Sequence, residues 1–375
     1  MSNILILGAG FGGVIAAESL VKELGSEHQI TLISRNRNFI FYPELVRLAF
    51  GKCEPDDIRF DVREAMLNHR VRFIEAEVAR IEPGSRHVKL AHGEIEGDLS
   101  YDYLIIALGR RLATERVAGF FEYAQHLLSI DSALKFGETL KKFEKGRAVI
   151  GQCPGSRLPV PVYETAFALS RMFEEKGTRD GIRITIVSPD PPGLQFGDGD
   201  VALALRSAFD EHSIEYLPDF PIERIEPGTL ITANGHRLNF SLLMLLPPFR
   251  GPGAVTGLSI TDDEGYIKVD RTLKVEGTAN IYAIGDCVNF AGPKLGHMAV
   301  QQAAVAAANV AAEIKGVKPS KFYDHELMLV IDEGGQESIY LHRGLWNTDS
   351  SVVKQGRFWT WAKRVHDKFW LAKHS

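Results

Sequence analysis

The segment LILGAGFGGVIAAESL, residues 5–20, connects an apolar run to an alanine-rich stretch through a turn rich in glycine. The apolar run predicts a buried parallel strand over Asn3–Leu7, and the alanine-rich stretch predicts a helix over Val14–Glu23. A strand that leads through a glycine-rich turn into a helix is the first unit of a doubly wound α/β sheet. We therefore expect an α/β fold that starts at the N-terminus.

The glycines of this turn have the G-x-G-x-x-G spacing of a dinucleotide-binding fingerprint. Gly8 allows a tight turn, Gly10 lets a pyrophosphate approach the backbone, and Gly13 lets helix and strand pack closely. The free N–H groups of the helix N-terminus would face the anion, so Phe11 and Gly12 are also candidate cofactor-binding residues. Such turns also occur for packing alone, and this segment by itself leaves that interpretation open.

The next predicted strand, Gln29–Ser34, follows at the distance that the fingerprint requires. An acidic residue at its end would bind the ribose hydroxyls, but this position holds Ser34, followed by Arg35. We keep both as candidate cofactor-binding residues, and the fingerprint is incomplete.

Two distant segments have a similar character. YDYLIIALG, residues 101–109, predicts a buried strand that ends in small residues, including Ala107 and Gly109. ANIYAIGDC, residues 279–287, predicts another strand that ends in Gly285 and Asp286, before a long alanine-rich helix over 298–315. Asp286 lies too far upstream to cap that helix.

Together the three segments resemble those of flavoproteins with two dinucleotide-binding domains, in which they enclose FAD. The resemblance implies that Asp286 contacts the ribityl or pyrophosphate part of the cofactor. In that family a threonine stands where this chain has Leu108, so one hydroxyl contact is missing.

NAD(P)H-using members carry a second fingerprint, and the corresponding segment here is AVIGQCPGSRLPVPVYE, residues 148–164. Gly151 and Gly155 are present, but prolines at 154, 159 and 161 remove backbone donors from the turn. The following strand, Ile182–Val187, ends in Ser-Pro where a ribose-binding residue is usual. The sequence therefore predicts impaired nicotinamide binding.

This pattern is similar to that of the sulfide:quinone oxidoreductases, and the resemblance runs from residue 2 to about 372. The matching segments are FIFYPE (39–44), DDI (56–58), VRFI (71–74), PVYE (161–164), LPPFRG (246–251) and GPKLGHM (292–298). The resemblance implies a small-molecule electron donor and a membrane quinone as acceptor, and it adds Pro43 and Val78 to the candidate cofactor-binding residues. The type II NADH dehydrogenases share less of the middle of the chain.

The chain departs from that family at its redox cysteines. A sulfide oxidase of this type needs two, so that sulfur is held while electrons pass to the flavin. By alignment to the family pattern, these positions are Leu158 and Leu329. Cys153 lies five residues from the first and is a candidate single redox thiol, with a buried packing role as the alternative. Cys287 is expected to pack, and nothing but a neighbouring lysine activates Cys53.

The resemblance places two further groups near the flavin. It places Lys294 beside the flavin N1/C2-oxygen edge, where a cation favours the anionic reduced form, although a surface loop lysine is the alternative. It directs Glu164 toward the flavin as a proton acceptor, although an acid in a first helical turn also complements the helix dipole. The segment 298–303 resembles the one that lines the quinone site of type II NADH dehydrogenases, which implies that Gln301 or Gln302 binds a quinone carbonyl; simple solvation is the alternative.

The C-terminal stretch FWTWAKRVHDKFWLAK, residues 358–373, places apolar residues with helical spacing at 358, 361, 362, 365, 369 and 372. Three tryptophans and the basic residues Lys363, Arg364, Lys368 and Lys373 accompany them. This is typical of a helix that lies in a membrane interface. A helix that packs on its own domain or on a partner in a homodimer is the alternative.

Composition limits the partners and the compartment. The net charge of −5 gives no attraction to nucleic acid. Three cysteines at unrelated spacings predict neither a metal site nor a disulfide framework. With no signal peptide pattern or apolar run long enough to span a bilayer, we expect a cytoplasmic protein, peripheral on the inner face of the cell membrane.

The expected architecture is α/β with two Rossmann-like domains, one inserted in the other. The FAD domain comprises residues 1–110 and 250–318, the second domain residues 111–249, and a short tail with an amphipathic helix residues 319–375. The first functional hypothesis is a flavin-dependent enzyme similar to sulfide:quinone oxidoreductases. The alternatives are a divergent type II NADH dehydrogenase and a flavin-binding scaffold without turnover.

Overall fold

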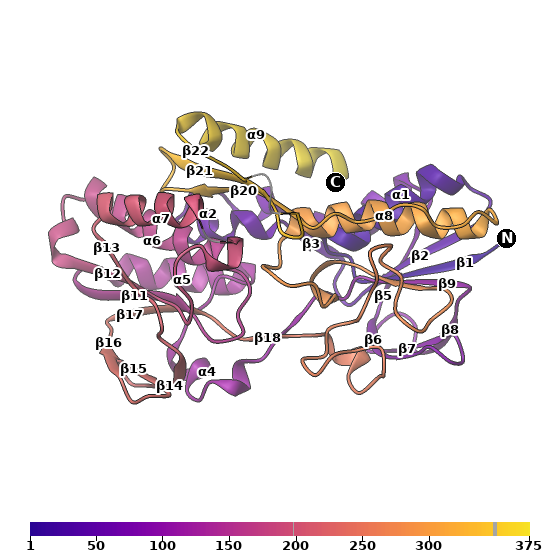
Figure 1. Ribbon diagram of the computed structural model, residues 1–375, viewed down its shortest axis with the longest axis horizontal. Coiled ribbons are helices and arrows are strands. Elements are labelled where there is room, and N and C mark those ends of the chain that lie inside the picture. The colour runs from indigo at the N-terminus through magenta and orange to yellow at the C-terminus, as the bar shows by residue number, and fades with distance from the viewer. Residues whose placement is uncertain (198, 348–350) are drawn as a thin grey trace.

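The computed structural model describes residues 1–197, 199–347 and 351–375, which form two lobes joined at their centre (Figure 1). The N-terminal lobe is built on a five-stranded parallel sheet with the order β19-β9-β1-β2-β5. Its strands are β1 (Asn3–Leu7), β2 (Gln29–Ser34), β5 (Arg72–Glu75), β9 (Tyr103–Ile106) and β19 (Ile281–Ala283). β19 comes from a part of the chain nearly 180 residues after β9, so this lobe is discontinuous in sequence.

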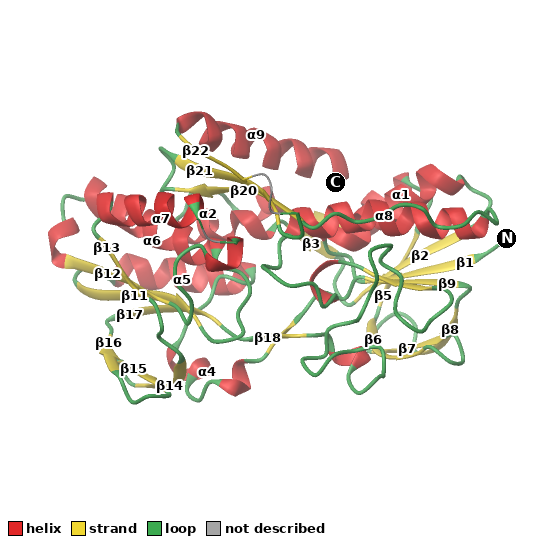
Figure 2. Cartoon of the chain, in the orientation of Figure 1, coloured by secondary structure: helices red, strands yellow, loops and turns green. Residues whose placement is uncertain are grey.

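Helices and a second sheet cover the parallel sheet (Figure 2). α1 (Phe11–Leu24) packs along α8 (Gly296–Ile314), and α3 (Val62–Asn68) contacts β5. The antiparallel strands β6 (Glu77–Glu82), β7 (His87–Ala91) and β8 (Gly97–Ser100) form a separate sheet. Ile4 and Leu7 on β1 are fully buried, as expected of a central parallel strand covered on both faces.

The second lobe contains a four-stranded parallel sheet with the order β13-β12-β11-β17. Its strands are β11 (Gly146–Gln152), β12 (Ile182–Val187), β13 (Ile214–Leu217) and β17 (Leu242–Leu246). The helices of this lobe are α4 (Phe120–Tyr123), α5 (Ile130–Lys142), α6 (Val160–Glu175) and α7 (Asp200–Glu211). A small antiparallel sheet follows, formed by β14 (Ile222–Glu226), β15 (Thr229–Thr232) and β16 (Arg237–Asn239).

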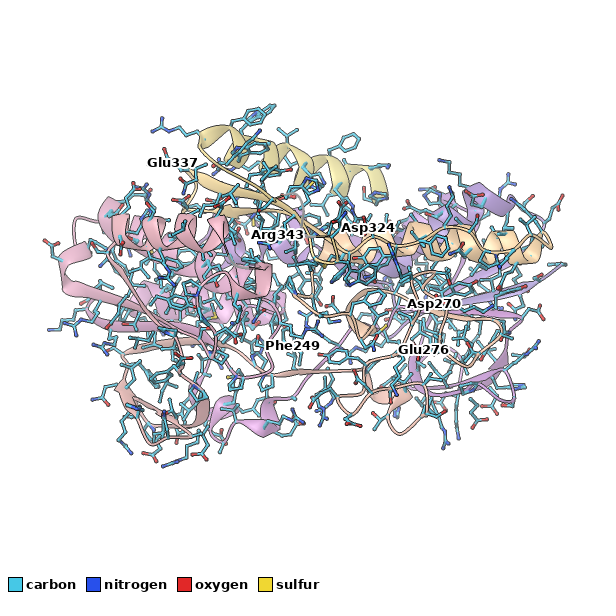
Figure 3. All side chains as sticks on the ribbon, viewed as in Figure 1. Phe249, Asp270, Glu276, Asp324, Glu337 and Arg343 are labelled. Atoms are coloured by element: carbon cyan, nitrogen blue, oxygen red, sulfur yellow. The ribbon has the colours of Figure 1, made fainter. Side chains whose placement is uncertain are left out.

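The chain crosses between the lobes through a two-stranded antiparallel connection of β10 (Arg111–Leu112) with β18 (Phe249–Arg250). Phe249 lies at this crossing, between the two lobes (Figure 3). The crossing points lie beside the sequence-based domain boundaries at 110/111 and 249/250. One early element, α2 (Leu45–Ala49), nevertheless packs on α5 of the second lobe.

The last third of the N-terminal lobe leads into a C-terminal layer that lies over both lobes (Figure 1). The strands β20 (Glu326–Asp332), β21 (Ser338–Gly344) and β22 (Ser351–Gln355) form an antiparallel sheet, and α9 (Arg357–His374) lies on it. Two short strands, β3 (Asn38–Ile40) and β4 (Arg59–Asp61), complete the regular structure described here. No helix among the described residues has the length and apolar character needed to cross a bilayer.

Three helices begin earlier than their sequence patterns indicate. α1 begins at Phe11 rather than Val14, α6 at Val160 rather than residue 162, and α8 at Gly296 rather than residue 298. Each added turn contains glycine or proline, which sequence patterns assign to turns. Both are tolerated in a first helical turn, where the N–H groups lack partners within the helix.

Candidate cofactor site

The turn between β1 and α1 depends on glycine at two positions. Gly8 has φ +98°, and a Cβ there would lie 2.3 Å from the carbonyl oxygen of Ala107. A Cβ on Gly13 would lie 1.7 Å from the carbonyl oxygen of Gly8. Both contacts are impossible for a larger residue, so the backbone can make this turn only with glycine.

The same turn leaves an open approach to the backbone. A Cβ on Gly10 would meet nothing within 4 Å. Gly10 is also the N-cap of α1, and its cap makes no side-chain hydrogen bond in the part of the chain that the structure describes. The N-terminus of α1 therefore offers unpaired N–H groups beside an open surface, which is the arrangement that binds a pyrophosphate.

The end of β19 meets this turn from the other side. A Cβ on Gly12 would lie 3.2 Å from Cδ1 of Ile284, so α1 and the Gly285–Asp286 turn are in direct contact. Asp286 is not a helix cap, because the N-cap of α8 is Leu295. Instead, its carboxylate forms an ion pair with the guanidinium of Arg110.

Arg110 belongs to the site although the sequence patterns did not single it out. Its guanidinium carbon lies 4.2 Å from the centre of the Phe249 ring, at the crossing between the lobes. Arg110 immediately follows Gly109, the last residue of the small-residue turn after β9. Its place directly after this predicted turn is the sequence feature that could have identified it. The residue ties Asp286 to the connection between the two lobes.

A small pocket adjoins Asp286. It is lined by Gly285, Asp286, Val288, Phe290, Pro293, Lys294, Leu295, Met298, Ala299, Gln302 and His325. Lys294 is buried and is not a surface lysine: its ammonium donates to the carbonyl oxygens of Val288 and Phe290. Burial, assisted by Arg157, lowers the pKa of Lys294 to about 7.

Comparison with known proteins agrees with this geometry. The family model described as pyridine nucleotide-disulphide oxidoreductase matches residues 2–303. The chain belongs to this family. It is an FAD-dependent oxidoreductase, and the glycine turn, the open N-terminus of α1 and the Gly285–Asp286 turn fit that cofactor.

Individual relatives extend the similarity over nearly the whole chain. A sulfide-quinone reductase of Aquifex aeolicus is 26% identical, with 99% of this chain and 90% of the relative covered. A type II NADH:quinone oxidoreductase of Haemophilus influenzae is also 26% identical, with 86% and 84% covered. The solved structure of the sulfide:quinone oxidoreductase from Aquifex aeolicus has a TM-score of 0.93 at 24% identity, covering 100% of this chain and 91% of that chain.

The remaining predicted cofactor residues of this flavoprotein lie at or beyond the end of β2, in a 3-10 turn and on β6. Ser34 ends β2 and is half-buried, with its Oγ accepting a hydrogen bond from the backbone of Asn36, and Arg35 is exposed. Pro43 is exposed in the 3-10 turn Tyr42–Glu44, and Val78 is half-buried on β6. Their roles toward FAD stay predictions.

Two further residues differ in what they can offer a cofactor. A Cβ on Gly109 (φ +69°) would meet nothing within 4 Å, so its backbone is accessible. The ring of Phe11 is occupied by an aromatic cluster, with centroids 5.0 Å from Phe39 and 4.9 Å from Trp370. Phe11 can therefore contribute its backbone N–H to the site, while its ring stabilises the fold.

The corresponding turn of the second lobe is closed. The backbone N–H groups of Val162 and Tyr163 both donate to the carbonyl oxygen of Pro159, and Pro161 has no N–H. In addition, Gln152 at the end of β11 donates to the Oγ of Ser188 at the end of β12. The start of α6 thus lacks the row of free donors that α1 presents.

The cysteines occupy packing positions. Cys153 is fully buried in an apolar cluster, and burial raises the pKa of its thiol. This environment favours the packing role over the single redox thiol, because a reactive cysteine needs a stabilised thiolate. Burial also raises the pKa of Cys287 to about 12 and that of half-buried Cys53 to about 11. Leu158 and Leu329 are half-buried against the core.

Glu164 lies in a buried ion pair rather than in open reach of a ligand. One of its oxygens accepts from the backbone N–H of Asp332, 2.9 Å away, and from the ammonium of Lys363 on α9. Burial raises the pKa of Glu164 to about 7, and Lys363 opposes the rise. Lys363 was counted among the basic residues typical of an interfacial helix, but its side chain is only 13% exposed and pairs inward with Glu164.

The two glutamines at the start of α8 are engaged within the protein. Gln302 is 2% exposed, and its Oε1 accepts from the backbone N–H of Gly285 at 2.6 Å. Gln301 donates to a carboxylate oxygen of Glu326, 2.7 Å away. Neither is simply solvated, and Gln302 instead holds the turn that carries Asp286.

Proposed function

We propose that this flavoprotein passes two electrons from a small donor through FAD to a membrane quinone, without a cysteine relay and without bound NADH. The similarity to a sulfide-quinone reductase over 99% of the chain supports the quinone acceptor. The single observation that carries the choice of donor is the start of α6, where Pro161 lacks an N–H and the N–H of Val162 donates to Pro159.

The donor must meet the flavin directly. With leucine at 158 and 329, no disulfide can form at the two positions where the family pattern has cysteines. When bound, FAD would accept an electron pair from the donor and release it to the quinone. The donor class that suits this chain is a small reduced species, with sulfide as the first candidate.

Burial brings the pKa of two side chains, Lys294 and Glu164, to about 7. Lys294 lines the pocket beside Asp286, and its lowered pKa lets it hold or give up a proton there. Glu164 and Lys363 form a buried acid–base pair between α6 and α9. Reduction of a quinone to a quinol consumes protons as well as electrons, and general acids with a pKa near the working pH transfer them most efficiently.

A membrane-facing surface supports the quinone assignment. Phe358, Trp361, Val365 and Phe369 are 46–66% exposed and follow one side of α9. Arg357, Arg364 and Lys368 are exposed on the same helix. Apolar rings with flanking cations suit a helix that rests in the interface of an anionic bilayer, where quinones dissolve.

A second candidate is a divergent type II NADH:quinone oxidoreductase. The 26% identity to the enzyme of Haemophilus influenzae favours it. It would require the start of α6 to rearrange so that its N–H groups face a pyrophosphate.

Anaerobic titration of the purified holoprotein with sulfide and, separately, with NADH distinguishes the candidates. We expect sulfide to bleach the visible flavin band and a soluble quinone analogue to restore it, with NADH ineffective. Bleaching by NADH alone would overturn the proposal in favour of the second candidate. A flavin that neither donor reduces, in a protein that still binds vesicles, would indicate a scaffold without turnover.

A further inference from the structure

Three buried polar side chains connect the Gly285–Asp286 turn to the loop that carries Lys294. They are Gln302 on α8 and Tyr323 and His325 in the segment before β20, and none is more than 3% exposed. The backbone N–H of Gly285 donates to Gln302, and the Tyr323 hydroxyl lies 2.9 Å from Nδ1 of His325. Nε2 of His325 lies 2.8 Å from the carbonyl oxygen of Ala291.

The direction of every hydrogen bond in this chain is fixed by chemistry. A carbonyl oxygen only accepts, so Nε2 of His325 carries the proton, and Nδ1 of the neutral ring then accepts from Tyr323. The amide group of Gln302 also acts on the Tyr323 hydroxyl and opposes the rise of its pKa that burial causes. The amide oxygen of Gln302 is left for the N–H of Gly285, at 2.6 Å. The order of donors and acceptors works only with His325 neutral.

Buried side chains donate hydrogen bonds to successive backbone carbonyls of the loop that carries Lys294. Lys294 donates to Val288 and Phe290, and Arg157 donates to Phe290 and Gly292. Nε2 of His325 donates to the carbonyl oxygen of Ala291, which lies between Phe290 and Gly292 in the sequence. The lining of the pocket includes His325 and Gln302 as well as Asp286 and Lys294. The Gly285–Gln302 hydrogen bond and the Tyr323–His325–Ala291 hydrogen bonds therefore hold the two sides of that pocket.

Aromatic packing gives the chain a single arrangement. The ring of His325 lies 5.6 Å from that of Phe290, 5.2 Å from that of Trp346 and 5.5 Å from that of Tyr323, centre to centre. Asp324, the residue between Tyr323 and His325, lies beside the start of β20 (Figure 3). The ring of His325 has no room to turn over without displacing these neighbours.

We propose that Gln302, Tyr323 and His325 are positioning residues that hold the Gly285–Asp286 turn and the Lys294 loop in the geometry that retains FAD. The proposal rests on the cofactor site described above and does not depend on which donor or acceptor the enzyme uses. Protonation of His325 would place a second donor against Tyr323. The tyrosine hydroxyl would then need an acceptor, and the Gln302 amide group offers none while its oxygen serves Gly285.

Charged and polar groups from several neighbouring elements act on the pKa of His325. Burial, Lys294 and Arg157 lower its pKa, while the bond to Ala291 and the charge of Asp324 raise it. His297 on α8 and Glu326 at the start of β20 are the other titratable neighbours of this region. The balance keeps the pKa of His325 below its usual value, which favours the neutral ring that the bond from Tyr323 requires.

The test compares His325→Gln with His325→Ala and Tyr323→Phe in the purified holoprotein. Glutamine can donate to Ala291 and accept from Tyr323, so it should preserve the chain, whereas the other two leave buried groups unpaired. FAD released on dilution is measured by flavin fluorescence. We expect H325A and Y323F to bind FAD about tenfold more weakly, because each leaves a buried polar group without its hydrogen-bond partner.

Tyr101→Phe is the matched control. Tyr101 is also buried in the N-terminal lobe, and its hydroxyl makes no hydrogen bond within the described part of the chain. The variant should retain FAD as the natural protein does. If H325A fails to fold, Y323F against H325Q still decides the question.

The dependence of FAD retention on pH is a second measurement, and a simple loss of packing would not change it. FAD retention by the natural protein should fall below the pKa of His325, while H325Q, which keeps every other neighbour, should show no such step. Equal retention in Y323F and the natural protein, or the same acid step in H325Q, would overturn the proposal. Because the readout is FAD retention, a failure to reduce quinone would contradict the proposed function and leave this inference standing.

Discussion

Replacing Trp361 with alanine should weaken vesicle binding and leave the free energy of unfolding almost unchanged. Trp361 is 61% exposed on the outer side of α9. For a side chain of roughly 250 Å² this is about 150 Å² of apolar surface, or at most about 4 kcal/mol at ~25 cal/mol per Å². If the bilayer interface covers half of it, the variant should bind vesicles about 30-fold more weakly.

Trp370 on the same helix is the matched control with the opposite outcome. Its ring is buried, 4.9 Å from that of Phe11 and 5.0 Å from that of Phe39. Trp370→Ala removes this packing and should lower the free energy of unfolding by about 3–5 kcal/mol. Vesicles of phosphatidylcholine with an anionic lipid serve for sedimentation binding, and urea unfolding measures stability. The reasoning fails if W361A binds vesicles like the natural protein, or if it destabilises as much as W370A.

Two further predictions concern buried charges. Lys363→Met should lower the free energy of unfolding by about 3–5 kcal/mol at pH 8, because the carboxylate of Glu164 is left buried without its partner. The deficit should shrink by about pH 5, where Glu164 takes up a proton, and urea midpoints at the two values check this; a deficit that is constant or grows on acidification would contradict it. In Lys294→Met, unfolding free energy should rise less steeply between about pH 7 and 10 than in the natural protein. In this pH range Lys294 is protonated in the unfolded natural protein but not in the folded protein, where its pKa is lowered to about 7. The free energy of unfolding of the natural protein therefore rises with pH. Parallel pH profiles of K294M and the natural protein would refute this prediction.

The fold was predictable because the responsible signals are local. Strand β1 and the glycine turn follow from the backbone requirements of a few adjacent residues, and the structure meets them at Gly8 and Gly13. The outer side of α9 was predictable for the same reason, since a 3.6-residue period fixes which side chains share a face. Phe358, Trp361, Val365 and Phe369 are indeed the exposed apolar residues of that helix.

The inward side of the same helix shows where local patterns stop. Composition grouped three tryptophans and four basic residues as one interfacial set. Trp359 instead stacks on Tyr340 at 4.0 Å, Trp370 fills an aromatic cluster, and Lys363 pairs with a glutamate 199 residues earlier in the chain. Nothing in a helical period says what the inner face meets, because the partner comes from another part of the chain.

The same limit explains the site residues that the motifs missed. Arg110, Arg157 and His325 act through partners 133 to 176 residues away or through single backbone carbonyls. A motif reports residues whose neighbours in sequence are also neighbours in space, as in the glycine turn. Hydrogen-bonded support for a cofactor loop is assembled from α8 and from loop residues beside β9, α6 and β20, which only the folded chain brings together. Residues of this kind are recognised by the partner that each buried donor has in the folded chain: Gln302 accepts from the backbone of Gly285, and His325 bridges Tyr323 and the carbonyl of Ala291.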